Sequence, residues 1–198
     1  MNKESNTYIF IYSAVLVVIV ATLLTATALW LQPYQQRNRD NEQRINILKA
    51  AGIADVNKDN ATQLFEQHCT ASLTLDEKGN NVDGGILPLY VIDNQTNVIP
   101  MQGSGLWGPI WGYIAIAADG TVVGANFDHE SETPGLGGEI TTDKFQSQFA
   151  GKQFLSNGNL LPIEVDAITG ATKTSNGVKE MIDKTIQMYL PYFNKHNN

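Results

Sequence analysis

The sequence predicts an α+β protein in which one transmembrane helix precedes a single domain built on an antiparallel sheet with flanking helices. A long apolar run occupies the first sixth of the 198 residues, β-hairpin patterns follow, and an amphipathic helix comes last. One cysteine excludes a disulfide framework or a Cys-rich metal site. The net charge of −7 argues against nucleic acid as a partner.

The apolar run covers residues 8–31 and is predicted to span a membrane after a short tail, residues 1–7. Its 24 residues form roughly 36 Å of helix, which exceeds a hydrocarbon core of about 30 Å. Pro33 is expected to stop this helix. A cleavable signal peptide is the alternative, because residues 26–28 fit a cleavage site, but the run is longer than a signal peptide requires.

The polar segment 32–50 is predicted to be a helical stalk. Arg37, Arg39 and Arg44 follow the apolar run, which favours a cytoplasmic location for the C-terminal part by simple charge counting. Long domains cross membranes largely regardless of such charges, so the sequence leaves the orientation open.

The remaining residues, 51–198, are predicted to form the domain, with two β-hairpins in its first half. Asp119-Gly120 is a strong hairpin signal for the second of them. The four strands are expected at residues 87–93 and 98–102, and at residues 112–117 and 121–127.

Helices are predicted in the second half of the domain. A short helix is expected at residues 143–149, capped by Thr141 or Thr142, and a further strand at residues 163–165. The last helix is expected to end at Pro191. Its apolar face recurs at helical spacing and consists of Val178, Met181, Ile182, Thr185, Ile186, Tyr189 and Leu190.

Residues 166–177 place small and hydroxylic side chains directly before this helix. Thr174 or Ser175 is expected to be its N-cap, and free N–H groups at a helix N-terminus favour a bound phosphate. An ordinary strand-to-helix turn with a good cap explains the same residues, so spacing alone leaves both interpretations open.

Residues 129–140 combine acidic, proline and glycine residues. His129 lacks a second histidine at ligand spacing, so no metal site is predicted. Pro134 fixes its φ angle, whereas Gly135 and Gly137 allow a flat ring to approach the backbone closely. This use of residues favours a ligand-binding wall.

Residues 166–172, Asp-Ala-Ile-Thr-Gly-Ala-Thr, resemble the flavinylation sequence of FMN-binding domains in redox-driven ion pumps. The resemblance implies that a flavin transferase esterifies the phosphate of FMN to Thr172. Residues 132–137, Glu-Thr-Pro-Gly-Leu-Gly, resemble a second signature of these domains and imply that Thr133 and Leu136 lie against the flavin. The other residues expected around the cofactor are Glu132, Gly135, Gly137, Asp166, Thr169, Gly170, Ala171, Thr174, Ser175 and Trp107.

Residues 8–12, 103–113 and 137–140 are similar to the C subunit of Na⁺-translocating NADH:quinone reductases, with the G subunit of the Rnf ferredoxin:NAD complex as the alternative relative. Trp107 is expected either near the flavin or as a buried core aromatic. Two departures from the family are visible: residues 74–86 look abbreviated, and Lys173 stands where an apolar residue is more familiar.

The resemblance implies a flavoprotein in the bacterial inner membrane, with one span and a periplasmic domain. It implies partnership with the other membrane subunits of a sodium-pumping NADH:quinone reductase, within which the chain relays electrons without turnover of its own. Cys69 beside His68 does not amount to a nucleophile–base pair, and no Gly-x-Gly-x-x-Gly motif is present for NADH. A cofactor-free anchored extracytoplasmic binding module is the hypothesis of a different class.

Overall fold

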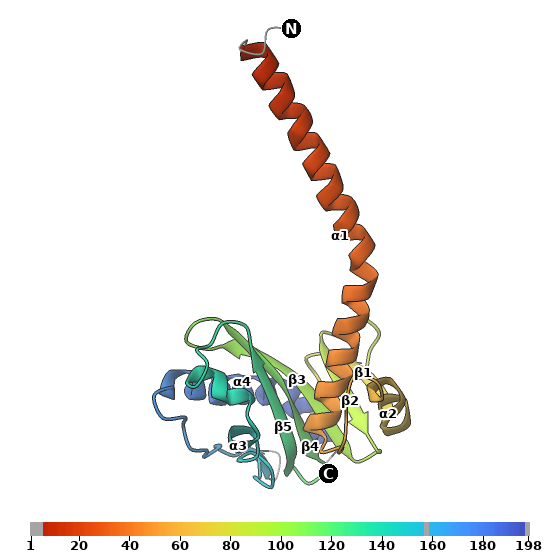
Figure 1. The fold of residues 1–198 in the computed structure, drawn as a ribbon. Helices are drawn as coiled ribbons and strands as arrows, with labels where there is room; N and C mark the ends of the chain where they lie inside the picture. Colours follow the sequence, from red (N-terminus) through yellow and green to blue (C-terminus); the bar gives the residue numbers. More distant parts are fainter. Residues whose placement is uncertain (1–5, 157–158, 197–198) are drawn as a thin grey trace. The chain divides into compact units, whose positions relative to one another are not determined.

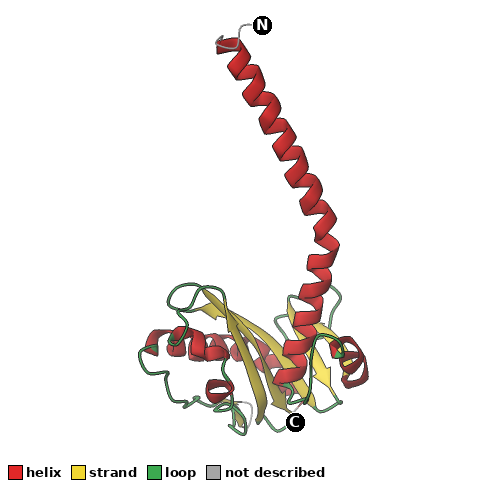
Figure 2. Ribbon diagram, viewed as in Figure 1, coloured by secondary structure: helices red, strands yellow, loops and turns green. Residues whose placement is uncertain are grey.

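The computed structural model describes residues 6–156 and 159–196 and confirms the α+β class (Figure 1, Figure 2). The chain divides after Glu42 into two compact units. The 45-residue helix α1 (Asn6–Ala50) contributes to both, because the division falls within it.

Helix α1 is long and apolar enough to cross a membrane. The prediction that Pro33 stops it is wrong, because Pro33 lies inside the helix. Proline removes one backbone hydrogen bond, but side-chain pairs support the next turns. The Gln36 amide donates to Asp40 Oδ1 at 2.8 Å, and Arg39 donates to Gln36 Oε1 at 3.1 Å.

Five strands of the second unit form one antiparallel sheet in the order β1-β2-β3-β4-β5. Both predicted hairpins are confirmed, as β2–β3 and β4–β5, whereas β1 and the preceding helix α2 (Ala61–His68) were not predicted. Gly120 adopts a φ of +84° in the β4–β5 turn. The strands are β1 (Cys69–Leu75), β2 (Leu87–Ile92), β3 (Thr96–Ser104), β4 (Pro109–Ala117) and β5 (Val122–His129).

Short elements follow β5 and lead to the last helix, α4 (Thr172–His196). The predicted helix at residues 143–149 is confirmed only in its first half, since α3 ends at Gln146 and turns continue to Gly151. The other short elements are the 3₁₀ helix η1 (Gly137–Thr141), α3 (Asp143–Gln146), and the two-stranded β6 (Leu155–Ser156) and β7 (Asn159–Leu160).

The segment predicted as a strand at residues 163–165 has no regular secondary structure and belongs to no sheet, so that prediction is wrong. Val165 is buried and Ile168 packs against the core, which explains the apolar pattern. Side chains satisfy backbone groups here, because Gln148 Oε1 accepts from the Asp166 N–H at 2.7 Å. The segment therefore needs no neighbouring strand at that point.

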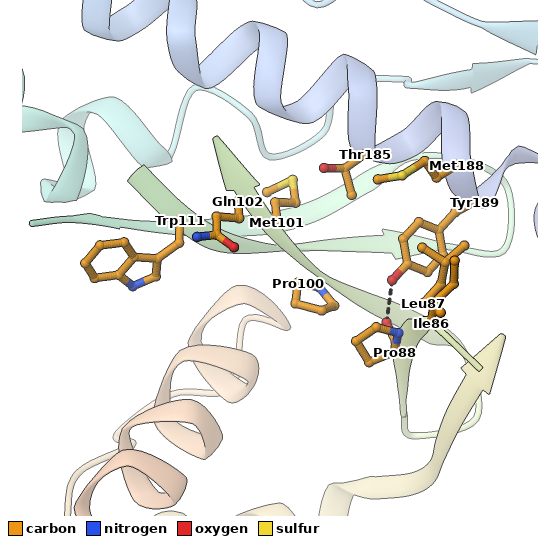
Figure 3. A pocket seen from close by; sticks show the side chains of 10 residues that line it. All are labelled: Ile86, Leu87, Pro88, Pro100, Met101, Gln102, Trp111, Thr185, Met188 and Tyr189. Carbon is orange, nitrogen blue, oxygen red and sulfur yellow. Dashed lines mark hydrogen bonds between the residues drawn. The ribbon is translucent and has the colours of Figure 1, made fainter. Parts of the chain in front are cut away.

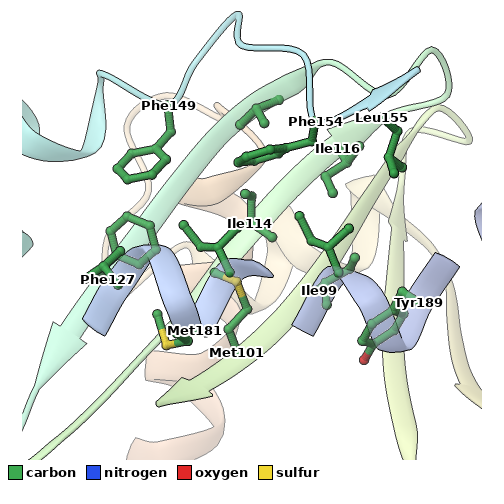
Figure 4. Packing of buried hydrophobic residues seen from close by; sticks show 14 of the residues in the cluster. Ile99, Met101, Ile114, Ile116, Phe127, Phe149, Phe154, Leu155, Met181 and Tyr189 are labelled. Atoms are coloured by element: carbon green, nitrogen blue, oxygen red, sulfur yellow. The ribbon is translucent and has the colours of Figure 1, made fainter. Parts of the chain in front are cut away.

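Helix α4 covers one face of the sheet and buries the predicted apolar face there, with only Leu190 partly buried (Figure 4). The prediction that Pro191 ends the helix is wrong. Tyr192 and Phe193, beyond the proline, are buried. Burying each aromatic side chain contributes about 1.5–3 kcal/mol, which offsets the cost of about 3 kcal/mol for a proline inside a helix.

The opposite face of the sheet carries a second, smaller core. Ile47 and Ala50 of α1 pack there on Ile92, Val98 and Ala115. The sheet is therefore buried on both sides within the second unit.

Candidate functional site

The N-terminus of α4 is set by a tight turn at residues 168–171. The Ala171 N–H donates to the Ile168 carbonyl at 2.9 Å, and Gly170 has a φ of +78°, a conformation that favours glycine. Thr172 is the first residue of the helix, and its side chain is exposed. The first turn of any α-helix leaves N–H groups without intrahelical partners, so the Thr172 hydroxyl lies where anions are favoured.

Thr174 and Ser175 lie within the first turn and are buried, so neither is the predicted N-cap. Ser175 Oγ donates to the Ala171 carbonyl and accepts from the Ile168 N–H, both at 3.0 Å. Ser175 thus fixes the turn from within the helix. Sequence reasoning placed the helix start too late because hydroxylic side chains also satisfy backbone groups from inside the first turn.

Glu132 is a buried carboxylate that joins two distant segments. Its Oε2 accepts from Thr174 Oγ1 at 2.6 Å, and its Oε1 accepts from the Trp107 N–H at 2.7 Å. Burial acts to raise the pKa of Glu132, but hydrogen bonds from Thr174 and from the backbone of residues 106–108 outweigh burial, and the pKa is lowered. The carboxylate is therefore ionised at neutral pH.

Two glycines make room for this carboxylate. A Cβ atom at Gly105 meets Glu132 Oε1, and one at Gly137 meets Glu132 Oε2, both in severe overlap. A Cβ atom at Gly177 of α4 would likewise overlap the Ser104 carbonyl, so the helix approaches the end of β3 without a side chain between them. The glycines thus bring the 105–108 loop, the 132–137 loop and the start of α4 together.

The two glycine-rich signature segments meet at Leu136 and Gly170. A Cβ atom built at Gly170 lies 3.0 Å from Leu136 Cδ2. Thr133 and Leu136 are exposed, and the Thr133 carbonyl accepts from the N–H groups of Leu136 and Gly138. Segments that are distant in the sequence therefore form one surface beside Thr172.

A cavity of about 610 Å³ opens between these segments and the η1–α3 region. Its size lies within the range of about 300–1,000 Å³ that is typical of small-molecule sites. Three predicted residues line it: Gly135, Asp166 and Thr169. The lining residues that were not predicted are Glu139, Thr142, Lys144, Phe145, Gln148, Ala167 and Ile168.

A second cavity, of about 560 Å³, lies between β2, β3 and α4 (Figure 3). The pairing of β2 with β3 ends at Tyr90 and Val98 and does not reach Pro88 or Pro100, neither of which has an N–H to donate. The Tyr189 hydroxyl donates to the Pro88 carbonyl at 2.6 Å instead. No residue of the two signature segments lines this cavity, so it is not the candidate site.

The structure brings most of the predicted site residues to the start of α4. The alternative that Trp107 is a buried core aromatic is wrong, because Trp107 is 68% exposed. Its neighbour Leu106 is 45% exposed. Lys144 and Gln148 were missed because no local motif marks them, and only the folding of α3 and the turn after it against residues 166–169 places them at the cavity.

Comparison with known proteins agrees with this site. A family model described as "FMN-binding domain" matches residues 105–187, which include both signature segments. Among solved structures, the C subunit of a Na⁺-translocating NADH-quinone reductase from Parabacteroides distasonis superposes with a TM-score of 0.74 at 30% identity. That match covers 82% of this chain and 96% of the other.

Curated relatives are likewise described as the C subunit of a Na⁺-translocating NADH-quinone reductase. The protein from Pasteurella multocida is 36% identical over 121 residues, which is 52% of this chain and 46% of the relative. The protein from Vibrio alginolyticus is 26% identical over 216 aligned positions, covering 83% of this chain and 84% of the relative. The first match thus spans less than half of the relative's length, and the second spans most of it.

Proposed function

The chain belongs to the family formed by the C subunits of Na⁺-translocating NADH-quinone reductases, and from this premise we propose that it carries FMN esterified to Thr172 and relays electrons within such a complex. The observation that carries the proposal is the meeting of both signature segments beside the exposed Thr172 side chain. The segment at residues 166–172 alone does not distinguish a cofactor site from a well-capped turn.

The residues around Thr172 fit a phosphoester. The hydroxyl is exposed and therefore within reach of a flavin transferase. Unpaired N–H groups of the first turn of α4 favour a phosphate at this position, and the positive charge of the adjacent Lys173 does the same. The buried Thr174 and Ser175 are already engaged in hydrogen bonds, which leaves Thr172 as the available acceptor within the first turn.

The cavity and its rim fit a planar ring. Gly135 lines the cavity and has nothing within 4 Å of its Cβ position. Thr133 and Leu136 of the same loop, and Trp107 of the 105–108 loop, offer exposed side chains to a ring. When bound, FMN supplies one- and two-electron redox chemistry, and the chain contributes packing, hydrogen bonds and exclusion of water. An attachment through the phosphate leaves the ring free to respond to these contacts.

The hydrogen bonds of the buried Glu132 carboxylate agree with an electron-relay role. Glu132 accepts hydrogen bonds from the Thr174 hydroxyl and the Trp107 N–H, which is a structural use of the acid. We infer that NADH and quinone react at other subunits, and that this chain holds its cofactor within reach of theirs. Sodium transport then belongs to the assembled complex.

Helix α1 anchors the protein in the inner membrane under this proposal. The domain lies on the periplasmic side, where the transferase acts in the family. A Glu164→Cys substitution in a Cys69→Ser background tests this orientation, because Glu164 is exposed. A membrane-impermeant maleimide should label Glu164→Cys in intact spheroplasts. Labelling only after lysis would place the domain in the cytoplasm.

The central test is the fate of the Thr172 hydroxyl. In a host with the transferase, mass spectrometry of the peptide 165–179 should show the added mass of FMN on Thr172. Thr172→Val keeps the side-chain shape and should abolish covalent flavin fluorescence in a denaturing gel, whereas Thr172→Ser keeps a hydroxyl and should retain it. Covalent flavin that persists in Thr172→Val would move the attachment elsewhere.

A further inference from the structure

We propose that Glu132 is a positioning residue that clamps the exposed Leu106–Trp107 tip to the first turn of α4, and so fixes the tip relative to the cofactor attached two residues before Thr174. This inference rests on the proposed function, since it assigns the clamp a role in holding the flavin. The clamp comprises Glu132, the Thr174 hydroxyl and the Trp107 N–H.

Burial of a carboxylate is costly unless hydrogen bonds compensate for it. Glu132 is only 4% exposed and therefore carries this cost. Apolar packing could fix a loop to a helix without burying a charge. The chain instead uses glycine at positions 105 and 137, where any side chain overlaps the carboxylate. Three segments are therefore shaped around one ionised group.

The clamp holds the Leu106–Trp107 tip by its backbone, because Glu132 accepts from the Trp107 N–H, and it holds the helix through the Thr174 hydroxyl. Glu132 holds Trp107 through its N–H, so the indole ring is left exposed and free to cover another surface. At the other end, Thr174 lies in the same helical turn as Thr172. One carboxylate thus sets the separation between a large aromatic side chain and the attachment residue.

Hydrogen exchange of flavin-free, full-length protein in detergent tests the clamp itself. Glu132→Ala removes both hydrogen bonds and should accelerate amide exchange at residues 106–108 about tenfold or more. Glu132→Gln should restore much of the protection, because its carbonyl accepts from Trp107 and its amide donates to Thr174. The matched control is Glu130→Ala, an exposed carboxylate in the same loop, which should leave exchange unchanged.

Flavin-loaded protein tests the positioning role. Glu132→Ala and Thr174→Val should both change the visible circular dichroism and the midpoint potential of the flavin, while Glu130→Ala should not. Unchanged exchange at residues 106–108 in Glu132→Ala, or a flavin signature identical to that of Glu130→Ala, overturns the clamp. A phosphoester found away from Thr172 overturns the proposed function instead, and the exchange result in flavin-free protein is independent of it.

Discussion

Gly170 provides the sharpest test of how the two signature segments meet. Its φ of +78° lies in the left-handed region, and a Cβ atom there stands 3.0 Å from Leu136 Cδ2. Gly151 has nearly the same φ, +76°, with nothing within 4 Å of its Cβ position. Alanine at these two glycines therefore imposes the same backbone cost, and only Gly170→Ala adds a contact with Leu136.

The magnitudes follow from these geometries. A non-glycine residue in the left-handed region costs about 1–2 kcal/mol, which both variants should lose. Moving Leu136 off its rotamer costs about 0.5–1.5 kcal/mol more. Only Gly170→Ala should show this additional decrease in the free energy of unfolding. For a domain of this size each kcal/mol corresponds to about 2–4 °C. Gly170→Ala should therefore melt about 1–6 °C below Gly151→Ala.

Thermal melts of the flavin-free protein, followed by near-ultraviolet circular dichroism in detergent, measure this difference. Adding Leu136→Ala to each variant provides the control, because truncating Leu136 should remove the extra loss from Gly170→Ala but leave Gly151→Ala unaffected. Equal melting temperatures for the two alanine variants, or an extra loss that survives Leu136→Ala, would refute the contact between the segments.

Four further outcomes are expected from thermal melts. Phe149→Ala should cost about 3–5 kcal/mol, because this fully buried ring packs on two others at 5.1 and 5.6 Å. Tyr189→Phe should cost about 1–3 kcal/mol, since the Pro88 carbonyl loses its donor, and it should leave the slope of the melt unchanged. Glu132 has a lowered folded pKa, so its stabilisation is complete above the ordinary value of 4.5 and is lost as pH falls through the folded pKa; Glu132→Gln should flatten stability against pH on that acid side. Burial raises the pKa of Asp183 above 3.8, so its ionisation destabilises the fold as pH rises, and Asp183→Asn should raise the melting temperature at pH 7 but not at pH 3.

Element types were predictable where the sequence pattern is local. The Asp119-Gly120 turn and the helical spacing from Val178 to Leu190 each depend on residues close in sequence, and both were confirmed. Strand β1 was not predicted, because its short run gains its partner only through pairing with β2, whose nearest residue in the register, Leu87, follows Leu75 after an intervening loop. The predictions that Pro33 and Pro191 end their helices were wrong for a related reason. A helix continues past a proline when the contacts of the following turns offset the free energy that the proline costs.

The candidate site shows the same division. The two glycine-rich segments could be singled out because each uses residue types that a core does not favour. The burial of Thr174, the exposure of Trp107 and the carboxylate that links them could not be predicted, because these properties depend on contacts between residues 107, 132 and 174.

The sequence by itself therefore determined the membrane-spanning helix candidate, the α+β class and the family, since each is encoded in local composition or in short motifs. Only the tertiary structure decided where the helices end, which hydroxyl at the start of α4 is exposed, and which carboxylate is buried. Those properties depend on whether a group contacts water or residues that are distant in the sequence. Such contacts exist only once the chain has folded, so local sequence cannot determine them.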